Sequence, residues 1–143
     1  MLIGIPSVVS PELLYVLDTI GHGDDIAIVD AFYPGVSQSK RCLRADGVES
    51  TILLDGILSL MNPDSFVSEP VLMMSPVPGD NADPSVEAGF RTVIDKHWPD
   101  TPAIAKLDRF GFYKRAMAAF AVVITGSTKK YGCIIIKKGV IPV

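Results

Sequence analysis

The chain has 143 residues, of which 48% are hydrophobic, and its formal net charge is −3. This charge argues against nucleic acid as a partner, because nucleic-acid binders present clustered basic residues and a net positive charge. The longest apolar run, Ala116 to Ile124, has nine residues, whereas a membrane span needs roughly 18. With a mean hydropathy of +0.36, the surplus of apolar residues indicates a subunit interface rather than a membrane.

Helical and strand patterns alternate along the sequence. Apolar spacing and capping residues predict helices over residues 11–20, 50–61, 84–97 and 108–119. Short apolar runs predict strands over 26–29, around 42–43, and over 71–74, 103–107, 120–124 and 134–136, with a loop containing Pro34 and Gly35 after the first strand. Strands that alternate with helices predict an α/β fold in which helices cover a largely parallel sheet, and the length fits one domain over residues 1–143.

The few cysteines and histidines exclude several kinds of site. Cys42 and Cys133 are far apart and form no C-x-x-C motif, so we interpret them as reduced thiols of a cytoplasmic protein. Pro6 and the absence of an early charged region argue against a signal peptide. His22 and His97 have no second ligand at zinc spacing, so no metal site is expected.

Candidate chemistry is expected where loops follow the strands, since ligands of open α/β sheets bind at the carboxyl ends of strands. Asp30 directly follows the first strand and could bind sugar hydroxyls, orient a histidine, or simply form a turn. His22 lies between two glycines and could transfer protons near neutral pH, or merely follow a helix end. Thr125, Gly126 and Ser127 follow another strand.

Two further segments are candidates. Arg109 stands beside three aromatic residues and could serve an interface, a ligand hydroxyl or an aromatic face. Tyr131 precedes Gly132 and could donate its phenol hydrogen, or only occupy a hairpin edge. Nucleotide-binding, phosphate-loop and serine-hydrolase motifs are absent, and the sequence does not fix the carboxylate spacing that glycosidase chemistry would require.

Several short motifs occur in an order and spacing that resemble the L-fucose mutarotase and D-ribose pyranase family of sugar-anomer isomerases, and more closely its fucose branch. They are Ser10-Pro11-Glu12-Leu13-Leu14, Gly21-His22-Gly23-Asp24, Asp30-Ala31, Arg44-Ala45-Asp46-Gly47, Arg109-Phe110-Gly111-Phe112-Tyr113, Val123-Ile124-Thr125-Gly126, Lys130-Tyr131-Gly132 and Lys137-Lys138-Gly139-Val140. The resemblance covers nearly the whole chain. It implies a three-layer α/β/α domain with a mainly parallel or mixed sheet, and ring-shaped homo-oligomers, typically decamers, whose sites lie between subunits.

The resemblance also implies a cofactor-free enzyme that interconverts the α and β anomers of a free monosaccharide by acid–base ring opening. His22 corresponds to the catalytic histidine, with Tyr131 as a second proton donor or relay. Asp30, Arg109 and the segment Tyr131, Gly132 and Cys133 correspond to the sugar-binding residues, and Asp30 is also a candidate to orient the imidazole. D-ribose pyranase activity and a catalytically silent sugar-binding protein remain alternatives.

This chain departs from the family pattern at two places. Cys133 stands where the family commonly has asparagine, and a thiol is a weaker hydrogen-bonding group than an amide. Phe32 and Tyr33 stand where the fucose branch usually has histidine and phenylalanine. These departures concern the sugar preference more than the type of reaction.

Overall fold

Six strands form one sheet in the order β2-β5-β1-β6-β3-β4. The structure, a computed structural model, describes all residues 1–143. The strands are β1 (Asp25–Val29), β2 (Cys42–Ala45), β3 (Val71–Met74), β4 (Ala105–Leu107), β5 (Ala121–Thr125) and β6 (Ile134–Lys137). The helices are α1 (Pro11–Thr19), α2 (Gly35–Gln38), α3 (Ser50–Leu58), α4 (Pro84–His97) and α5 (Arg109–Ala118).

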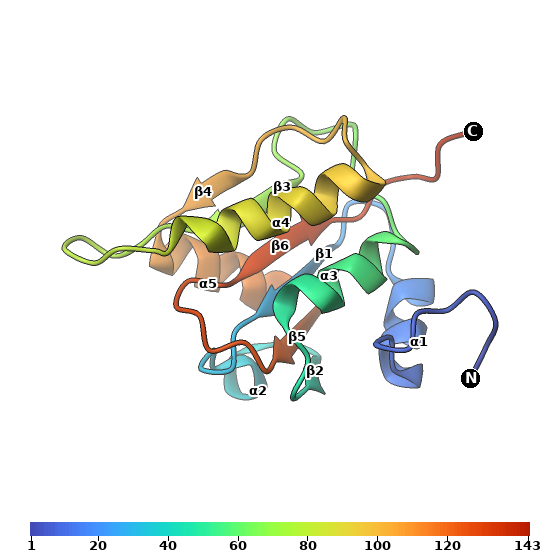
Figure 1. Ribbon diagram of the computed structural model, residues 1–143, viewed down its shortest axis with the longest axis horizontal. Coiled ribbons are helices and arrows are strands. Elements are labelled where there is room, and N and C mark those ends of the chain that lie inside the picture. Colours follow the sequence, from blue (N-terminus) through green and yellow to red (C-terminus); the bar gives the residue numbers. More distant parts are fainter.

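The sheet is mixed because β6 runs against both of its neighbours. β1 pairs in parallel with β5, β5 with β2, and β3 with β4, whereas β6 pairs antiparallel with β1 and β3. In Figure 1 the arrowheads of β1 and β6 accordingly point to opposite sides. The carboxyl ends of β1 to β5 therefore share one edge of the sheet with the residues that enter β6.

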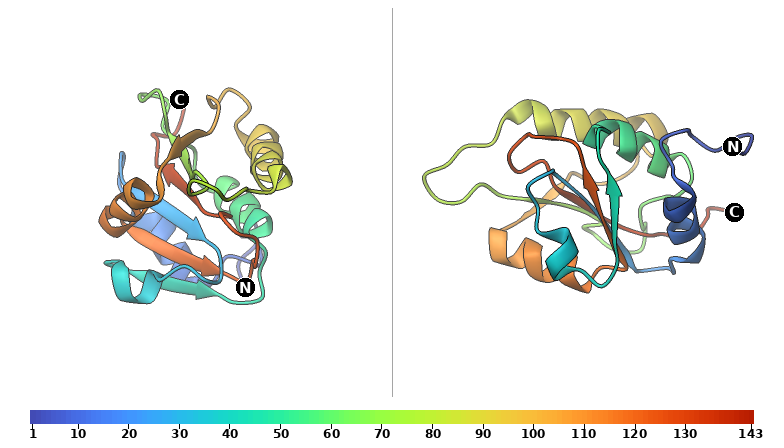
Figure 2. Two further views of the ribbon diagram at one scale, coloured as in Figure 1. Left: turned by 90° about the vertical axis from the view of Figure 1, so that its left-hand side faces the viewer. Right: turned by 90° about the horizontal axis from the view of Figure 1, so that it is seen from below.

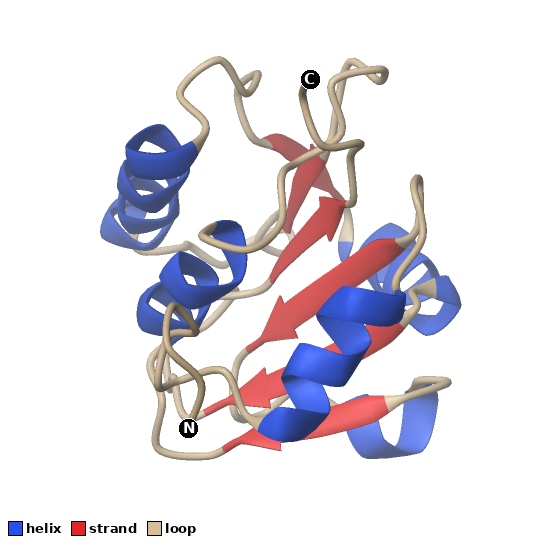
Figure 3. Cartoon of the chain, turned by 90° about the vertical axis from the view of Figure 1, so that its right-hand side faces the viewer, coloured by secondary structure: helices blue, strands red, loops and turns tan.

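Helices cover both faces of the sheet, so the molecule has three layers. Viewed from below, α3 and α4 lie above the sheet and α2 and α5 lie beneath it (Figure 2, right). Figure 3 shows the same separation from the end at which α1 lies. The predicted α/β fold is confirmed. No helix combines the length and apolar character that crossing a membrane requires.

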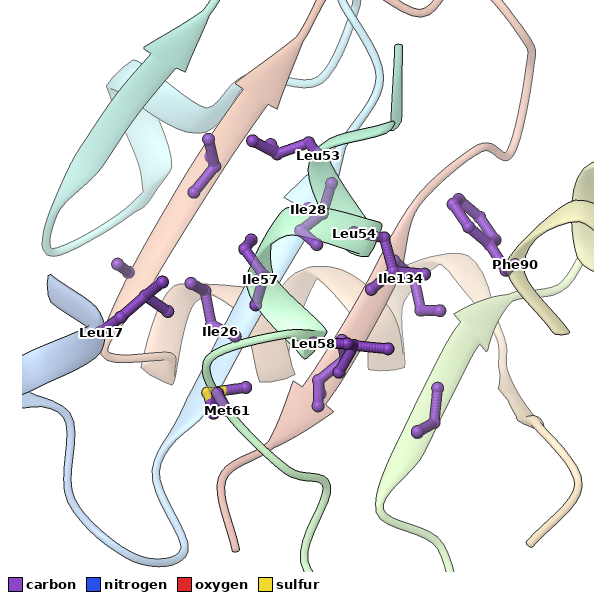
Figure 4. Packing of buried hydrophobic residues seen from close by; sticks show 14 of the residues in the cluster. Leu17, Ile26, Ile28, Leu53, Leu54, Ile57, Leu58, Met61, Phe90 and Ile134 are labelled. Atoms are coloured by element: carbon purple, nitrogen blue, oxygen red, sulfur yellow. The ribbon is translucent and has the colours of Figure 1, made fainter. Parts of the chain in front are cut away.

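The alternation of side chains along the strands divides the core in two. On one face, Ile26, Ile28 and Ile134 pack against Leu53 and Phe90 of the helices (Figure 4). On the other face a smaller cluster forms, in which the strand side chains that point to that face pack against α5 and the loop after β1. Strands that are buried on both faces read as continuous apolar runs, which is why β1, β3 and β5 were visible in the sequence.

Local sequence signals explain most helix ends. Ser10 caps α1, Asp83 caps α4 and Asp108 caps α5, each by accepting a backbone N–H from the first turn. One prediction was wrong: the segment predicted as a loop after β1 contains the short helix α2. Gly35 begins α2 so close to β5 that a Cβ atom there would lie 3.1 Å from the Ile124 side chain.

Candidate active site

A pocket lies at the carboxyl edge of the sheet, beside the segment that enters β6. Its volume is about 330 Å³, which suits a small ligand. The lining residues are Asp30, Phe32, Tyr33, Met74, Val77, Arg109, Tyr113, Lys130, Tyr131 and Cys133. Four of the five substrate-binding candidates from the sequence thus line one cavity, and the fifth, Gly132, lies between two of them.

Asp30 is held rigidly in the wall of this pocket. It directly follows β1 and is only 8% exposed. The Phe32 N–H donates to Asp30 Oδ1 at 3.0 Å, and the Cys133 thiol donates to Asp30 Oδ2 at 3.3 Å. Burial raises the pKa of the Cys133 thiol well above its usual value, and the neighbouring Asp30 carboxylate raises it further. Cys133 therefore stays protonated and helps to hold an acceptor that faces the pocket.

Tyr131 is fixed by its hydroxyl as well as by its backbone. The hydroxyl donates to Asp80 Oδ2 at 2.7 Å and accepts from the Val77 N–H at 3.4 Å. Hydrogen bonds from Tyr131 and from Lys130, whose Nζ is 2.9 Å from Asp80, lower the pKa of Asp80 to about 2. Asp80 is thus an ionised carboxylate that accepts a strong hydrogen bond from the Tyr131 hydroxyl.

The backbone at Tyr131 adopts a left-handed conformation, with φ of 59°, which is uncommon for a bulky residue and often marks functional sites. The following turn needs Gly132, since a Cβ atom there would lie 2.9 Å from the Lys129 carbonyl oxygen. The turn places Tyr131 and Cys133 on the same pocket.

Arg109 is the first residue of α5 and is exposed at the rim of the pocket. Its guanidinium carbon is 5.4 Å from the ring centre of Tyr113 and 5.8 Å from that of Phe110. It forms no ion pair within the chain, so its donors are available to a ligand or a neighbouring subunit.

His22 lies at the opposite end of the strands from the pocket, just before the start of β1. It precedes β1, whereas Asp30 follows β1, and five extended residues span about 17 Å. Within one chain Asp30 therefore does not orient the imidazole, because an extended strand separates the two side chains, and a contact with the His22 of another subunit stays a prediction. Gly23, with φ of 84°, forms the turn after His22. Its N–H donates to the Lys138 carbonyl at 2.9 Å, and its own carbonyl accepts from Lys137 Nζ at 2.9 Å.

The partner of His22 within the chain is Asp64. His22 Nε2 is 3.2 Å from Asp64 Oδ1, and the imidazole lies 5.5 Å from the ring centre of Phe66. The His22 side chain is 48% exposed, whereas that of Asp64 is 3% exposed. Although burial opposes it, the Phe66 N–H and His22 lower the pKa of Asp64. A buried carboxylate thus fixes one imidazole nitrogen and leaves the ring accessible.

Other polar residues that stood out in the sequence have structural roles. Asp25 is buried in ion pairs with Arg115 at 2.7 Å and Lys137 at 3.0 Å. Thr125 donates to the Val29 carbonyl at 2.8 Å inside the sheet. Asp64 and Asp80 were not predicted as site residues, because each lies in a loop and its partner is 42 or 51 positions away in the sequence. No group of three or more His, Cys, Asp or Glu side chains is arranged to hold a metal ion.

This α/β fold with an edge pocket for a polar ligand has known relatives. The chain belongs to the RbsD / FucU transport protein family, whose sequence model matches residues 3–141. It is 50% identical over 143 residues to the L-fucose mutarotase of Actinobacillus pleuropneumoniae serotype 5b, which covers 100% of this chain and 99% of that relative. The L-fucose mutarotase of Haemophilus influenzae strain 86-028NP is 48% identical over the same length, with the same coverage of both chains.

Solved structures agree with this assignment. The fucose mutarotase of Streptococcus pneumoniae, determined in complex with L-fucose, has a TM-score of 0.93 and 42% identity and covers 99% of this chain and 100% of its own. Bacillus subtilis RbsD, complexed with D-ribose, has a TM-score of 0.71 at 20% identity, with 94% and 95% covered, which shows a shared fold. The family resemblance expected from the ordered motifs is confirmed.

Proposed function

We propose that this protein is an isomerase, a mutarotase that interconverts the α and β anomers of free L-fucose or a closely related aldose without a cofactor. The observation that carries the proposal is full-length similarity, at 50% identity, to proteins named L-fucose mutarotase. The edge pocket supports it, since Asp30, Arg109 and Tyr131 offer both acceptors and donors to sugar hydroxyls. The whole chain, residues 1–143, acts as one mutarotase domain.

Mutarotation needs proton transfers at two oxygens of the sugar. The ring oxygen gains a proton while the anomeric hydroxyl loses one, and the bond between the anomeric carbon and the ring oxygen breaks. The resulting aldehyde carbon rotates, and the ring closes on its other face with the reverse proton transfers. Positioned acid–base groups accelerate such steps by roughly 10²–10⁴-fold. His22 carries one of these protons, since imidazole both donates and accepts near neutral pH.

Tyr131 serves as the second proton-transfer group. Its proton already points at the ionised Asp80 carboxylate, 2.7 Å away. A lone pair of the Tyr131 oxygen is then free to accept a hydrogen bond from a sugar hydroxyl. Tyr131 exchanges this proton with the sugar through its own hydroxyl, and Asp80, a weak base because of its low pKa, holds that hydroxyl in place. Asp30 and Arg109 bind the remaining hydroxyls and hold the sugar in place.

In this proposal His22 reaches the sugar from a neighbouring subunit. Within one chain, β1 separates His22 from the pocket. Both places carry exposed aromatic rings: Phe66 beside His22 is 76% exposed, and Phe32 and Phe110 beside the pocket are 70% and 75% exposed. Exposed apolar surface of this kind marks a subunit interface. We therefore propose a ring-shaped homo-oligomer, a decamer, with each site at a subunit interface.

The two cysteines are both free, which supports our further proposal that the protein resides in the reducing cytoplasm.

Anomer-exchange NMR on L-fucose between pH 5 and 8 tests the function. We expect exchange well above the uncatalysed rate for the wild-type protein, and a loss of roughly 10²-fold or more for His22→Ala. The matched control is His97→Gln, which changes the only other histidine, located at the end of α4. Exchange in His22→Ala that equals the wild-type rate would contradict the role of His22.

The same experiment decides between the other candidate functions. Faster exchange between the pyranose and furanose forms of D-ribose, with no effect on L-fucose, would indicate a ribose pyranase instead. Saturable sugar binding without faster exchange at any pH would indicate a silent binding protein. Either result would overturn the proposed activity.

A further inference from the structure

The hydroxyl of Tyr33 is a buried donor without a partner. Tyr33 is only 7% exposed, and its hydroxyl oxygen makes no hydrogen bond. The other buried side-chain oxygen without a hydrogen bond belongs to Asp25, but that atom lies 3.0 Å from Lys137 Nζ and is neutralised by it. Tyr33 therefore holds the one buried side-chain polar atom of the chain that no group of the chain compensates.

Tyr33 belongs to the wall of the edge pocket. Its backbone N–H donates to the Asp30 carbonyl at 3.2 Å in the turn after β1. Its ring packs edge-on against Tyr113, with 5.2 Å between ring centres, and against Phe112, with 6.1 Å. Burial raises the pKa of Tyr33, and the nearby Cys133, Tyr113 and Asp30 groups raise it further. The phenol therefore keeps its proton and is a donor at every physiological pH.

Packing alone does not account for this hydroxyl. A phenylalanine would present the same ring to Phe112 and Tyr113, whereas a desolvated hydroxyl without a partner is unfavourable. Buried polar groups nearly always have a hydrogen-bond partner, so one that has none within the chain points to a partner from outside it. The ligand expected beside Tyr33 is the occupant of the pocket that Tyr33 lines together with Asp30 and Cys133.

We propose that Tyr33 is a further substrate-binding residue, whose hydroxyl donates a hydrogen bond to a hydroxyl oxygen of the bound monosaccharide. The proposal rests on the proposed function. Asp30 can only accept when ionised, and the protonated Tyr33 is a donor, so the pair recognises a group that both donates and accepts. A sugar hydroxyl is such a group, and a deoxy position is not. The Tyr33 oxygen is covered, so the sugar reaches it with a small side-chain adjustment, which is common on binding.

Tyr33→Phe tests this role, because it removes one oxygen and keeps the ring. We expect the affinity for L-fucose, measured by titration NMR, to fall roughly three- to tenfold, as for the loss of one neutral hydrogen bond. We expect the maximal exchange rate to change much less than the affinity, and the melting temperature of the sugar-free variant to equal or exceed that of the wild type. The matched control is Tyr15→Phe, on the exposed surface of α1, which should leave all three unchanged.

A series of monodeoxy derivatives of L-fucose completes the test. For the derivative that lacks the hydroxyl bound by Tyr33, wild type and Tyr33→Phe should bind with equal affinity, while the other derivatives keep the difference. Equal affinity of both proteins for L-fucose itself would overturn the assignment of Tyr33 and leave the proposed function standing. A sugar-free Tyr33→Phe variant that melts well below the wild type would also overturn it, since the hydroxyl would then have a partner within the protein. If the wild type neither binds nor converts L-fucose, the proposed function fails and the role of Tyr33 fails with it.

Discussion

The Cys133 thiol connects the candidate sugar site to the core of the sheet. Its sulfur donates to the Asp30 carboxylate at 3.3 Å and accepts from the Asp30 N–H at 3.5 Å. The residue is 1% exposed and packs in the smaller of the two hydrophobic clusters. A thiol forms weaker hydrogen bonds than an amide, but here it serves two groups of one buried aspartate. Its contribution to binding therefore acts through the orientation of Asp30.

Cys133→Ala should destabilise the protein, because it leaves two buried polar groups of Asp30 without this partner. We expect a loss of about 1 kcal/mol in the free energy of unfolding, measured by urea denaturation, together with weaker binding of L-fucose. Cys42→Ala is the matched control, since the Cys42 thiol is half-buried and forms a long hydrogen bond, 3.7 Å, to the carbonyl of its neighbour Leu43 rather than to a buried aspartate. Equal losses for the two variants would mean that the thiol of Cys133 contributes packing alone.

At the scale of residues, the sequence allowed prediction of the site only where chemistry and position agreed. Asp30 was accessible to prediction because it follows an apolar strand, and the end of such a strand is a common site for ligands. Asp80 and Asp64 occur in ordinary loop sequences. Their importance arises from contacts with Tyr131 and His22, which only the folded chain brings near.

At the scale of elements, α3 and α4 are joined by one acidic residue. Asp55 of α3 receives hydrogen bonds from Lys96 at 2.8 Å and from His97 at 2.7 Å, at the end of α4. Trp98 adds a bond to the Leu58 carbonyl at 2.8 Å. The hydrogen bonds from Lys96 and His97 lower the pKa of Asp55. Its ionised form is therefore favoured in the folded state.

Asp55→Asn should weaken this connection in a pH-dependent way. A depressed folded-state pKa stabilises the protein above the ordinary aspartate pKa, and the stabilisation is lost as the pH falls through the folded-state value. The side chain is 40% exposed, so we expect only about 0.5 kcal/mol at pH 7. Urea denaturation at pH 7 should show this loss, and the difference from wild type should shrink below pH 4. Asp100→Asn, which removes an exposed carboxylate without an ion pair, should show no loss at either pH.

The elements themselves were predictable where their apolar patterns were long or their caps distinct, as in α4 with Asp83 and Pro84. α2 was missed because four residues are too few for a helical period to appear. The direction of β6 could not be predicted from the sequence either, because a short apolar strand has the same residue pattern whether it pairs parallel or antiparallel. Helix α3 ends at Leu58, earlier than its apolar pattern suggested, because Leu60 and Met61 continue the pattern in a turn.

At the scale of the whole molecule, the two parts of the proposed site lie at opposite edges of one sheet. The pocket takes its residues from the carboxyl edge, and His22 with Asp64 lies at the amino end of β1. His22 and Asp30 are close in sequence, yet an extended strand holds them apart. In the proposed function a complete site requires two chains, and the exposed aromatic rings at both places would then lie at the same subunit interface.

Mixing two inactive variants tests this arrangement. His22→Ala lacks the proton carrier and Arg109→Ala lacks part of the pocket, so each protein alone should show little anomer exchange on L-fucose. If subunits are dissociated, mixed in equal amounts and reassembled, about a quarter of the interfaces in a closed ring should join an intact His22 to an intact pocket. Exchange should then recover to about a quarter of the wild-type rate. Asp30→Asn mixed with Arg109→Ala is the control, because both changes affect the same half of the site and no intact pocket results. Native mass spectrometry verifies that mixed oligomers form, and mixed oligomers of His22→Ala and Arg109→Ala without recovered exchange would show that each site is built within a single chain.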